Sequence, residues 1–92
     1  MPLLEHEIET LVIAWAMDRG WLCPKLAWIG ETGWPDRTFF RDGKVVLIEF
    51  KAPGKTIYPK QRYWIDKLRS LDIPVFICDD VQEGIAFLLS HD

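Results

Sequence analysis

The sequence has little of what zinc sites, membrane spans and disulfide frameworks require. It contains two cysteines, Cys23 and Cys78, and two histidines among 92 residues. Two cysteines cannot form a zinc site alone, and their wide separation in strand-like runs favours buried free thiols over a disulfide. No apolar run approaches the ~20 residues of a membrane span, and the start of the chain does not resemble a secretory signal. We therefore expect a cytoplasmic protein with no membrane partner.

Repeats, low-complexity segments and linkers are also absent from the sequence. A chain of 92 residues has room for one domain, residues 1–92. Apolar residues make up 49% of it, including five Trp and five Phe, which is enough for a hydrophobic core. Because a core of this size gives only marginal stability, a partner subunit would help.

The net charge of −3 argues against a general nucleic-acid-binding protein, but the charge is unevenly distributed. Residues 51–69 carry six basic residues and one acidic residue, a net charge of +5, whereas the rest of the chain carries −8. Such a segment suits a phosphate backbone, although a solvated helix face is an equally good interpretation. The basic residues are Lys51, Lys55, Lys60, Arg62, Lys67 and Arg69.

A β-hairpin is the strongest structural signal in the chain. Two β-rich runs, residues 33–40 and 44–51, flank the turn that contains Asp42-Gly43. Asp-Gly between such runs favours a type I′ turn, which needs positive φ at both central residues. With this two-residue loop, the residue numbers of each directly opposed pair add up to 85.

This register brings three charged residues to one end of the hairpin. Asp36 lies directly opposite Glu49, with Cβ atoms roughly 4.5–5.5 Å apart, and Lys51 shares their face. The two carboxylates repel each other, and a hard divalent cation such as Mg²⁺ would relieve the repulsion. The three residues therefore predict a site for phosphodiester hydrolysis. A structural accident is the alternative, because Glu-x-Lys is common by chance and an Asp after Pro often caps a turn.

Helical periodicity predicts three helices around the hairpin. The first covers residues 3–19, with Pro2 in its first turn and Gly20 at its end. The second runs from Pro59 to about residue 71, and Asp80 caps the third.

Two further strands are expected, at residues 21–29 and 73–78. Pro24 marks the first as an edge strand or a bulge. The second follows a helix, and a right-handed crossover pairs it parallel to residues 44–51. The predicted order is αβββαβα around a mixed sheet, which is an α/β fold.

Four other residues are candidates for the site. Glu5 lies at the edge of the apolar stripe of the first helix and could reach a metal held by the sheet, with Glu9 as the alternative. Gln61 shares the buried face at the start of the second helix. Trp34 could stack on bases or wedge a duplex, although packing in a turn is the more common role.

Three blocks of the sequence occur in a characteristic order and spacing: Gly33-Trp34-Pro35-Asp36, Ile48-Glu49-Phe50-Lys51-Ala52-Pro53-Gly54 and Lys60-Gln61-x-x-Trp64. They resemble the VRR-Nuc (virus-type replication-repair nuclease) domain of the PD-(D/E)xK nuclease superfamily, and the resemblance covers nearly the whole chain. It implies a restriction-endonuclease-like core and a metal-dependent nuclease of the stand-alone phage or bacterial type.

The resemblance also implies roles for individual residues. Mg²⁺ or Mn²⁺ is expected on Asp36, Glu49 and the main-chain carbonyl of Phe50, with Glu5, first in the block Glu5-His6-Glu7-Ile8-Glu9, as a further ligand. Lys51 is expected to position or activate the attacking water, and Gln61 to orient Lys51 or a phosphate. The expected DNA contacts are Lys55, Lys60, Arg62 and Trp34, and Tyr58 and Lys60 are expected at the rim of the site.

The substrate is expected to be branched DNA. No recognition helix, zinc finger or basic arm is visible in the sequence, so DNA shape is a better target than base sequence. Stand-alone members of the family are associated with homodimers that cut four-way (Holliday) junctions, and a two-fold dimer would present two sites. The alternatives are a general or restriction-like DNase, a catalytically silent nucleic-acid-binding module, and an α/β interaction domain without a metal site.

Overall fold

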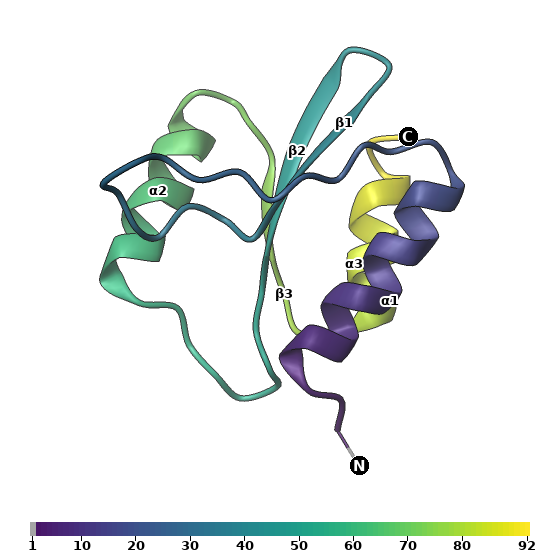
Figure 1. Cartoon of the computed structure of the whole chain (residues 1–92), viewed down its shortest axis with the longest axis horizontal. Coiled ribbons are helices and arrows are strands. Elements are labelled where there is room, and N and C mark those ends of the chain that lie inside the picture. The colour runs from purple at the N-terminus through teal and green to yellow at the C-terminus, as the bar shows by residue number, and fades with distance from the viewer. Residues whose placement is uncertain (1) are drawn as a thin grey trace.

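In the computed structural model, which describes residues 2–92, three helices pack on a three-stranded sheet of order β1-β2-β3 (Figure 1). β1 pairs antiparallel with β2, and β2 pairs parallel with β3, so the predicted α/β class and mixed sheet are confirmed. The elements are α1 (Glu5–Asp18), β1 (Arg37–Arg41), β2 (Lys44–Phe50), α2 (Pro59–Ser70), β3 (Val75–Cys78) and α3 (Val81–Leu89).

The hairpin has the predicted register. Arg41 pairs with Lys44 and Arg37 pairs with Ile48, and each pair of numbers sums to 85. Both turn residues are left-handed, with φ of 49° at Asp42 and 76° at Gly43. The Asp-Gly turn thus determines which residues of β1 and β2 lie opposite one another.

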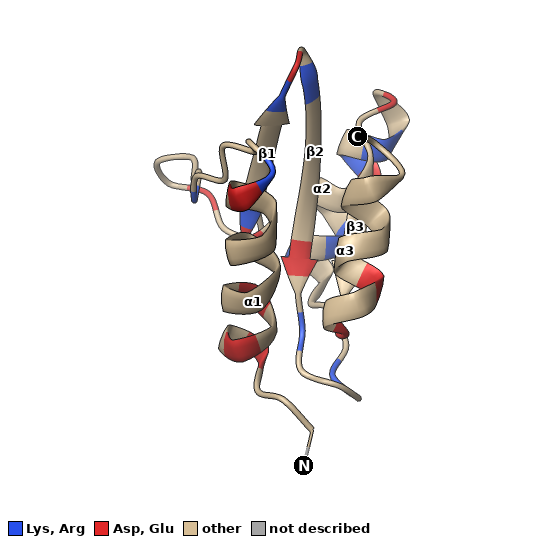
Figure 2. Ribbon diagram, turned by 90° about the vertical axis from the view of Figure 1, so that its right-hand side faces the viewer, with Lys and Arg blue, Asp and Glu red and all other residues tan. Residues whose placement is uncertain are grey.

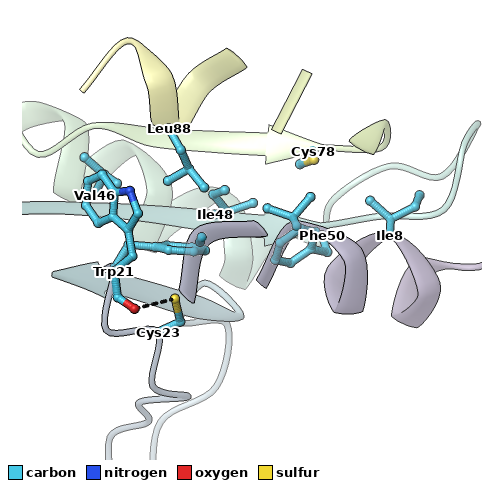
Figure 3. Close-up of a cluster of buried hydrophobic side chains, with 11 residues drawn as sticks. Ile8, Trp21, Cys23, Val46, Ile48, Phe50, Cys78 and Leu88 are labelled. Atoms are coloured by element: carbon cyan, nitrogen blue, oxygen red, sulfur yellow. Dashed lines mark hydrogen bonds between the residues drawn. The ribbon is translucent and has the colours of Figure 1, made fainter. Parts of the chain in front are cut away.

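The larger hydrophobic cluster lies between the sheet and the two helices α1 and α3, which occupy one face (Figures 1 and 3). Ile8 of α1, Ile48 of β2 and Leu88 of α3 meet there, each at most 1% exposed. Alternate residues of β2 point to this face because side chains in a strand alternate between faces. Its buried members are Ile8, Val12, Ala16, Trp21, Cys23, Phe39, Val46, Ile48, Phe50, Cys78 and Leu88.

A smaller cluster lies on the opposite face, under α2. Leu47 of β2 and Val75 of β3 pack against Ile65 and Leu68 of α2. Leu47 is therefore on the α2 face, and the same alternation places Glu49 and Lys51 on this face as well.

The strand predicted at residues 21–29 does not form, and this prediction was wrong. Leu22 makes one isolated bridge with Phe40, and Pro24 accepts one further hydrogen bond from the backbone of β1. Proline has no N–H with which to extend the ladder. Beyond it the chain leaves the sheet, and Trp28 packs against other tryptophans instead.

The remaining differences are small. α1 begins at Glu5, so Pro2 precedes the helix instead of occupying its first turn. The side chain of Asp80 caps α3 as predicted, accepting a hydrogen bond from the backbone N–H of Glu83. Within the described part of the chain, no helix has the length and apolar character needed to cross a membrane.

Both cysteines are buried free thiols, as predicted. Burial raises the pKa of Cys23 and the pKa of Cys78 to about 11 each, so the thiolate form is disfavoured. The cysteines therefore belong to the core and not to the chemistry of the molecule.

Candidate active site

Glu49 and Lys51 are the charged end of an otherwise apolar row on β2. Every second residue of β2 faces α2. Leu47, which precedes Glu49 on this face, belongs to the smaller hydrophobic cluster. Both charged residues are buried, with 2% of Glu49 and 7% of Lys51 exposed. Burial of two charged side chains is costly unless each has a partner, so their contacts are informative.

Asp36 joins this pair from the start of the hairpin. It directly precedes β1, and continuation of the register places it opposite Glu49. Its Oδ2 accepts a hydrogen bond of 2.8 Å from the backbone N–H of Phe50, which fixes the carboxylate beside the end of β2. The structure thus brings Asp36, Glu49 and Lys51 together.

Three partners determine the electrostatics of Glu49. Its Oε2 lies 3.6 Å from Nζ of Lys51 and accepts a hydrogen bond of 2.9 Å from Nε2 of Gln61. The pKa of Glu49 is raised from 4.5 to about 7, mainly by burial and then by the neighbouring charge of Asp36, while Lys51 opposes both effects. Additional positive charge near Glu49 would therefore favour its ionised form.

The pKa of Asp36 is also raised. Burial raises its pKa above the usual value, the hydrogen bond from Phe50 opposes this, and the charge of Glu9 raises the pKa again. A buried carboxylate and a half-buried carboxylate that lie side by side, both with raised pKa values, form a natural cation site.

Gln61 bridges the sheet and the start of α2. Its Oε1 accepts a hydrogen bond of 2.8 Å from the backbone N–H of Tyr58, while its amide donates to Glu49. The expectation was an orienting role toward Lys51 or a phosphate, and the contact in the structure is to Glu49. The ring of Tyr58 in turn lies 4.8 Å from Nζ of Lys51, so the ammonium group is held between a carboxylate and an aromatic face.

Gly33 explains why the loop before Asp36 can approach α2 so closely. Its φ is +90°, and a Cβ there would lie 2.7 Å from the backbone carbon and oxygen of Lys60. Only glycine fits such a contact without a shift of the backbone. The first residue of the Gly33-Trp34-Pro35-Asp36 block thus sets the distance between the loop and the helix that carries Gln61.

The oxygens of the two carboxylates fit a divalent cation. The hydrogen bonds from Phe50 and Gln61 reach Oδ2 of Asp36 and Oε2 of Glu49. Lys51 donates its N–H to β3, so the N–H and C=O of Phe50 point the other way, toward Asp36. Two carboxylates and one carbonyl are the oxygen ligands that Mg²⁺ prefers. Within residues 2–92, no group of three or more His, Cys, Asp or Glu is placed to hold a metal ion, so waters would complete the coordination.

Two glutamates of α1 were proposed as metal ligands, and the interactions of Glu9 connect it more closely to the site than those of Glu5. It pairs with Arg37 at 2.8 Å and with Lys25 at 3.7 Å, and its charge acts on Asp36. Glu5 is exposed, and its side chain makes no hydrogen bond or ion pair with another described residue. Figure 2 shows the acidic first turns of α1 beside the acidic end of β2. Arg37 was missed from the sequence, although it directly follows Asp36 and therefore points to the α1 face.

The residues expected to contact DNA lie around α2. Lys55 is exposed in the loop after β2, Lys60 pairs with Glu31 at 3.3 Å, and Arg62 pairs with Asp66 at 3.4 Å. Trp34 is half-buried, and its ring contacts Trp28 and Trp64.

Comparisons with known proteins agree on one family. The model of the VRR-NUC domain matches residues 8–82, a segment that includes Glu9, Asp36, Glu49, Lys51 and Gln61 but not Glu5. A solved chain described as a VRR_NUC domain has a TM-score of 0.85 at 19% sequence identity, covering 96% of this chain and 97% of that chain. A sequence search of curated proteins gives no match. At this identity the structural likeness shows a shared fold.

Proposed function

The chain belongs to the VRR-NUC domain family, which implies a nuclease-type fold, and on this premise we propose that it is a metal-dependent DNA endonuclease. One observation carries the proposal. Asp36, which is half-buried, and Glu49, which is buried, lie side by side, and an ammonium group lies 3.6 Å from Glu49. Two carboxylates and a lysine in this arrangement suit hydrolysis of a phosphodiester.

Asp36, Glu49 and the main-chain carbonyl of Phe50 would hold Mg²⁺ or Mn²⁺. When bound, such an ion lowers the pKa of a coordinated water and neutralises charge on a phosphate. Glu9, which already influences the charge of Asp36, is the better placed of the two α1 glutamates for a supporting role.

Lys51 is the residue that would act on the reacting groups. Its ammonium is held by Glu49 and by the ring of Tyr58, so little side-chain freedom is lost when it meets a phosphate oxygen. There it positions the attacking water and stabilises the negative charge that develops on the phosphate. Gln61 holds the carboxylate of Glu49 in place through its amide.

We further propose that the substrate is branched DNA, such as a four-way junction, cut by a homodimer. The described residues include no recognition helix or zinc finger that would read bases, and a two-fold dimer would present two sites to paired strands. A general or restriction-like DNase on the same fold is the competing function, and a silent nucleic-acid-binding module is the second.

Cleavage of a DNA panel by the wild type and by Asp36→Asn, Glu49→Gln and Lys51→Met tests the activity. We expect Mg²⁺- or Mn²⁺-dependent cleavage by the wild type and at least a hundredfold loss in each variant, since each removes a group that contacts the metal or the phosphate. Glu83→Gln, an exposed change on α3, is the matched control and should retain full activity. Undiminished cleavage by the Asp36 or Glu49 variant would refute the proposed site.

The same panel separates the substrates. Junctions and flaps cut in preference to linear duplex support a structure-selective enzyme, whereas preferential cutting of unbranched duplex supports a general DNase. Metal binding and DNA binding without any cleavage would identify a silent module.

A further inference from the structure

Three tryptophans from distant parts of the sequence meet beside the proposed site. The ring of Trp28 lies 4.9 Å from that of Trp64 and 5.6 Å from that of Trp34, measured between centroids. Tyr63 extends the group, with its ring 5.0 Å from Trp64. We call Trp28, Trp34, Tyr63 and Trp64 the aromatic platform.

The platform is anchored yet open to solvent. Nε1 of Trp64 donates a hydrogen bond of 3.0 Å to the carbonyl of Thr32, which ties the loop to α2. Trp34 and Trp64 are half-buried, but 53% of Trp28 and 53% of Tyr63 remain exposed. Figure 1 shows the long loop between α1 and β1 extending away from α1 and α3 to reach α2. Large rings held rigidly in water offer contact area at little cost in conformational entropy.

Basic side chains flank the rings. Lys60, Tyr63, Trp64 and Lys67 follow one another at positions i, i+3, i+4 and i+7 of α2, so they share one face of the helix. Lysines interleaved with exposed aromatics are the pattern of surfaces that bind single-stranded nucleic acid, where rings stack on bases and ammonium groups neutralise phosphates.

The platform is also continuous with the proposed site. Trp34 is two residues from Asp36, so their Cα atoms are at most about 7 Å apart. On the helix side, Gln61 follows Lys60 directly and donates its hydrogen bond to Glu49. A nucleotide resting on the platform would therefore be a close neighbour of a phosphate at the carboxylates.

We propose that Trp28, supported by Trp34 and Trp64, stacks on an unpaired base of the DNA substrate next to the scissile phosphate. The inference rests on the proposed nuclease function and deepens it, because it names the DNA feature that the site would select. A base presents its face to a ring only when it is unstacked, as at a flap or an open junction. Stacking accepts every base, which agrees with a reader of DNA shape.

A second copy of the chain is the competing occupant of these exposed rings. A two-fold interface places the same patch against itself. Lys67 and Lys60, the latter paired with Glu31, would then meet a surface that carries the same lysines, and like charges across an interface oppose association. The charge of the patch thus favours DNA.

Fluorescence of 2-aminopurine in an unpaired flap, measured with the full chain in Ca²⁺ to support binding without turnover, tests the stacking. The wild type should quench the probe. Trp28→Leu, which keeps apolar bulk but loses the aromatic face, should abolish the quenching and weaken binding of flapped DNA about tenfold, with little change for linear duplex. Trp28→Phe should restore most of the effect. Leu71→Ala, an exposed apolar residue at the end of α2, serves as the control and should behave as wild type.

Three results would overturn the inference. The first is that Trp28→Leu quenches the probe as strongly as the wild type does. The second is that Trp28→Leu loses affinity for flap and duplex equally. The third is that sedimentation shows a changed oligomeric state in Trp28→Leu. Cleavage assays in Mg²⁺ keep the two proposals apart. Absence of cleavage by the wild type counts against the nuclease function alone, whereas normal cleavage with unchanged quenching in Trp28→Leu counts against the platform alone.

Discussion

The two faces of the sheet differ most at the end of β2. On the face covered by α1 and α3, Ile48 and Phe50 are completely buried among apolar side chains. On the face covered by α2, the row that includes Leu47 continues with Glu49 and Lys51, which are nearly as deeply buried. Successive residues of one strand thus perform opposite tasks. The apolar face stabilises the fold, and this leaves the other face free to bury charges that lower stability in the absence of a ligand.

The largest expected effect contrasts two neighbours in β2. Ile48→Ala removes fully buried methyl groups from the larger cluster and should lower the free energy of unfolding by about 2–5 kcal/mol. Glu49→Gln keeps the shape of the side chain and should cost little stability while abolishing cleavage. Urea denaturation of both variants measures the contrast. A Glu49→Gln protein as destabilised as Ile48→Ala would show that the charged row is structural.

The second effect is the pH dependence of stability. Folding raises the pKa of Glu49 from 4.5 to about 7, so the folded protein retains a proton that the unfolded chain loses in that range. The contribution of this group to stability is full below about pH 4.5 and is lost as the pH rises to about 7, by at most ~3 kcal/mol. Denaturation midpoints in EDTA should therefore fall from pH 5 to pH 8 more in the wild type than in Glu49→Gln. Equal pH profiles would contradict the raised pKa.

A smaller effect tests the contact between the loop and α2. Gly33→Ala places a Cβ 2.7 Å from backbone atoms of Lys60 at a φ of +90°, whereas Gly30 has a φ of +81° with no atom within 4 Å. Both alanines strain the backbone, but only Gly33→Ala also displaces the loop, so we expect it to cost ~1–3 kcal/mol and to reduce cleavage. Thermal denaturation and cleavage of the two variants measure the difference. Similar losses in both would mean that the close contact is unimportant for the site.

The smallest effect lies away from the site. Asp80→Ala removes the side-chain oxygen that caps α3 and should cost about 1 kcal/mol. Activity per folded molecule should remain that of the wild type, because α3 covers the apolar face. A loss of activity larger than the loss of folded protein would show that the two faces are coupled.

The geometry of the candidate site was predictable from the sequence because one local turn determines it. Asp42 and Gly43 define the register, and its continuation beyond β1 places Asp36 opposite Glu49. Gln61 could be assigned to the buried start of α2 from helical spacing. The sequence could not show that Gln61 would bond to Glu49 and not to Lys51, because its partner depends on the orientation of α2 across the sheet.

The segment between α1 and β1 could not be predicted in the same way. Its apolar residues suggested a strand, but Trp28 contacts Trp34 and Trp64, which lie 6 and 36 residues further along the chain. The ion pair between Glu9 and Arg37, which links α1 to β1, could not be predicted for the same reason. Such contacts depend on how whole elements pack, and a local pattern does not contain that information.

Calorimetric titration of Mn²⁺ into the metal-free protein at about pH 8 tests the central claim most directly, because both carboxylates should then be ionised. We expect saturable binding by the wild type and by Glu83→Gln, and its loss in Asp36→Asn and Glu49→Gln. No binding by the wild type, or undiminished binding by the Asp36 variant, would contradict the account.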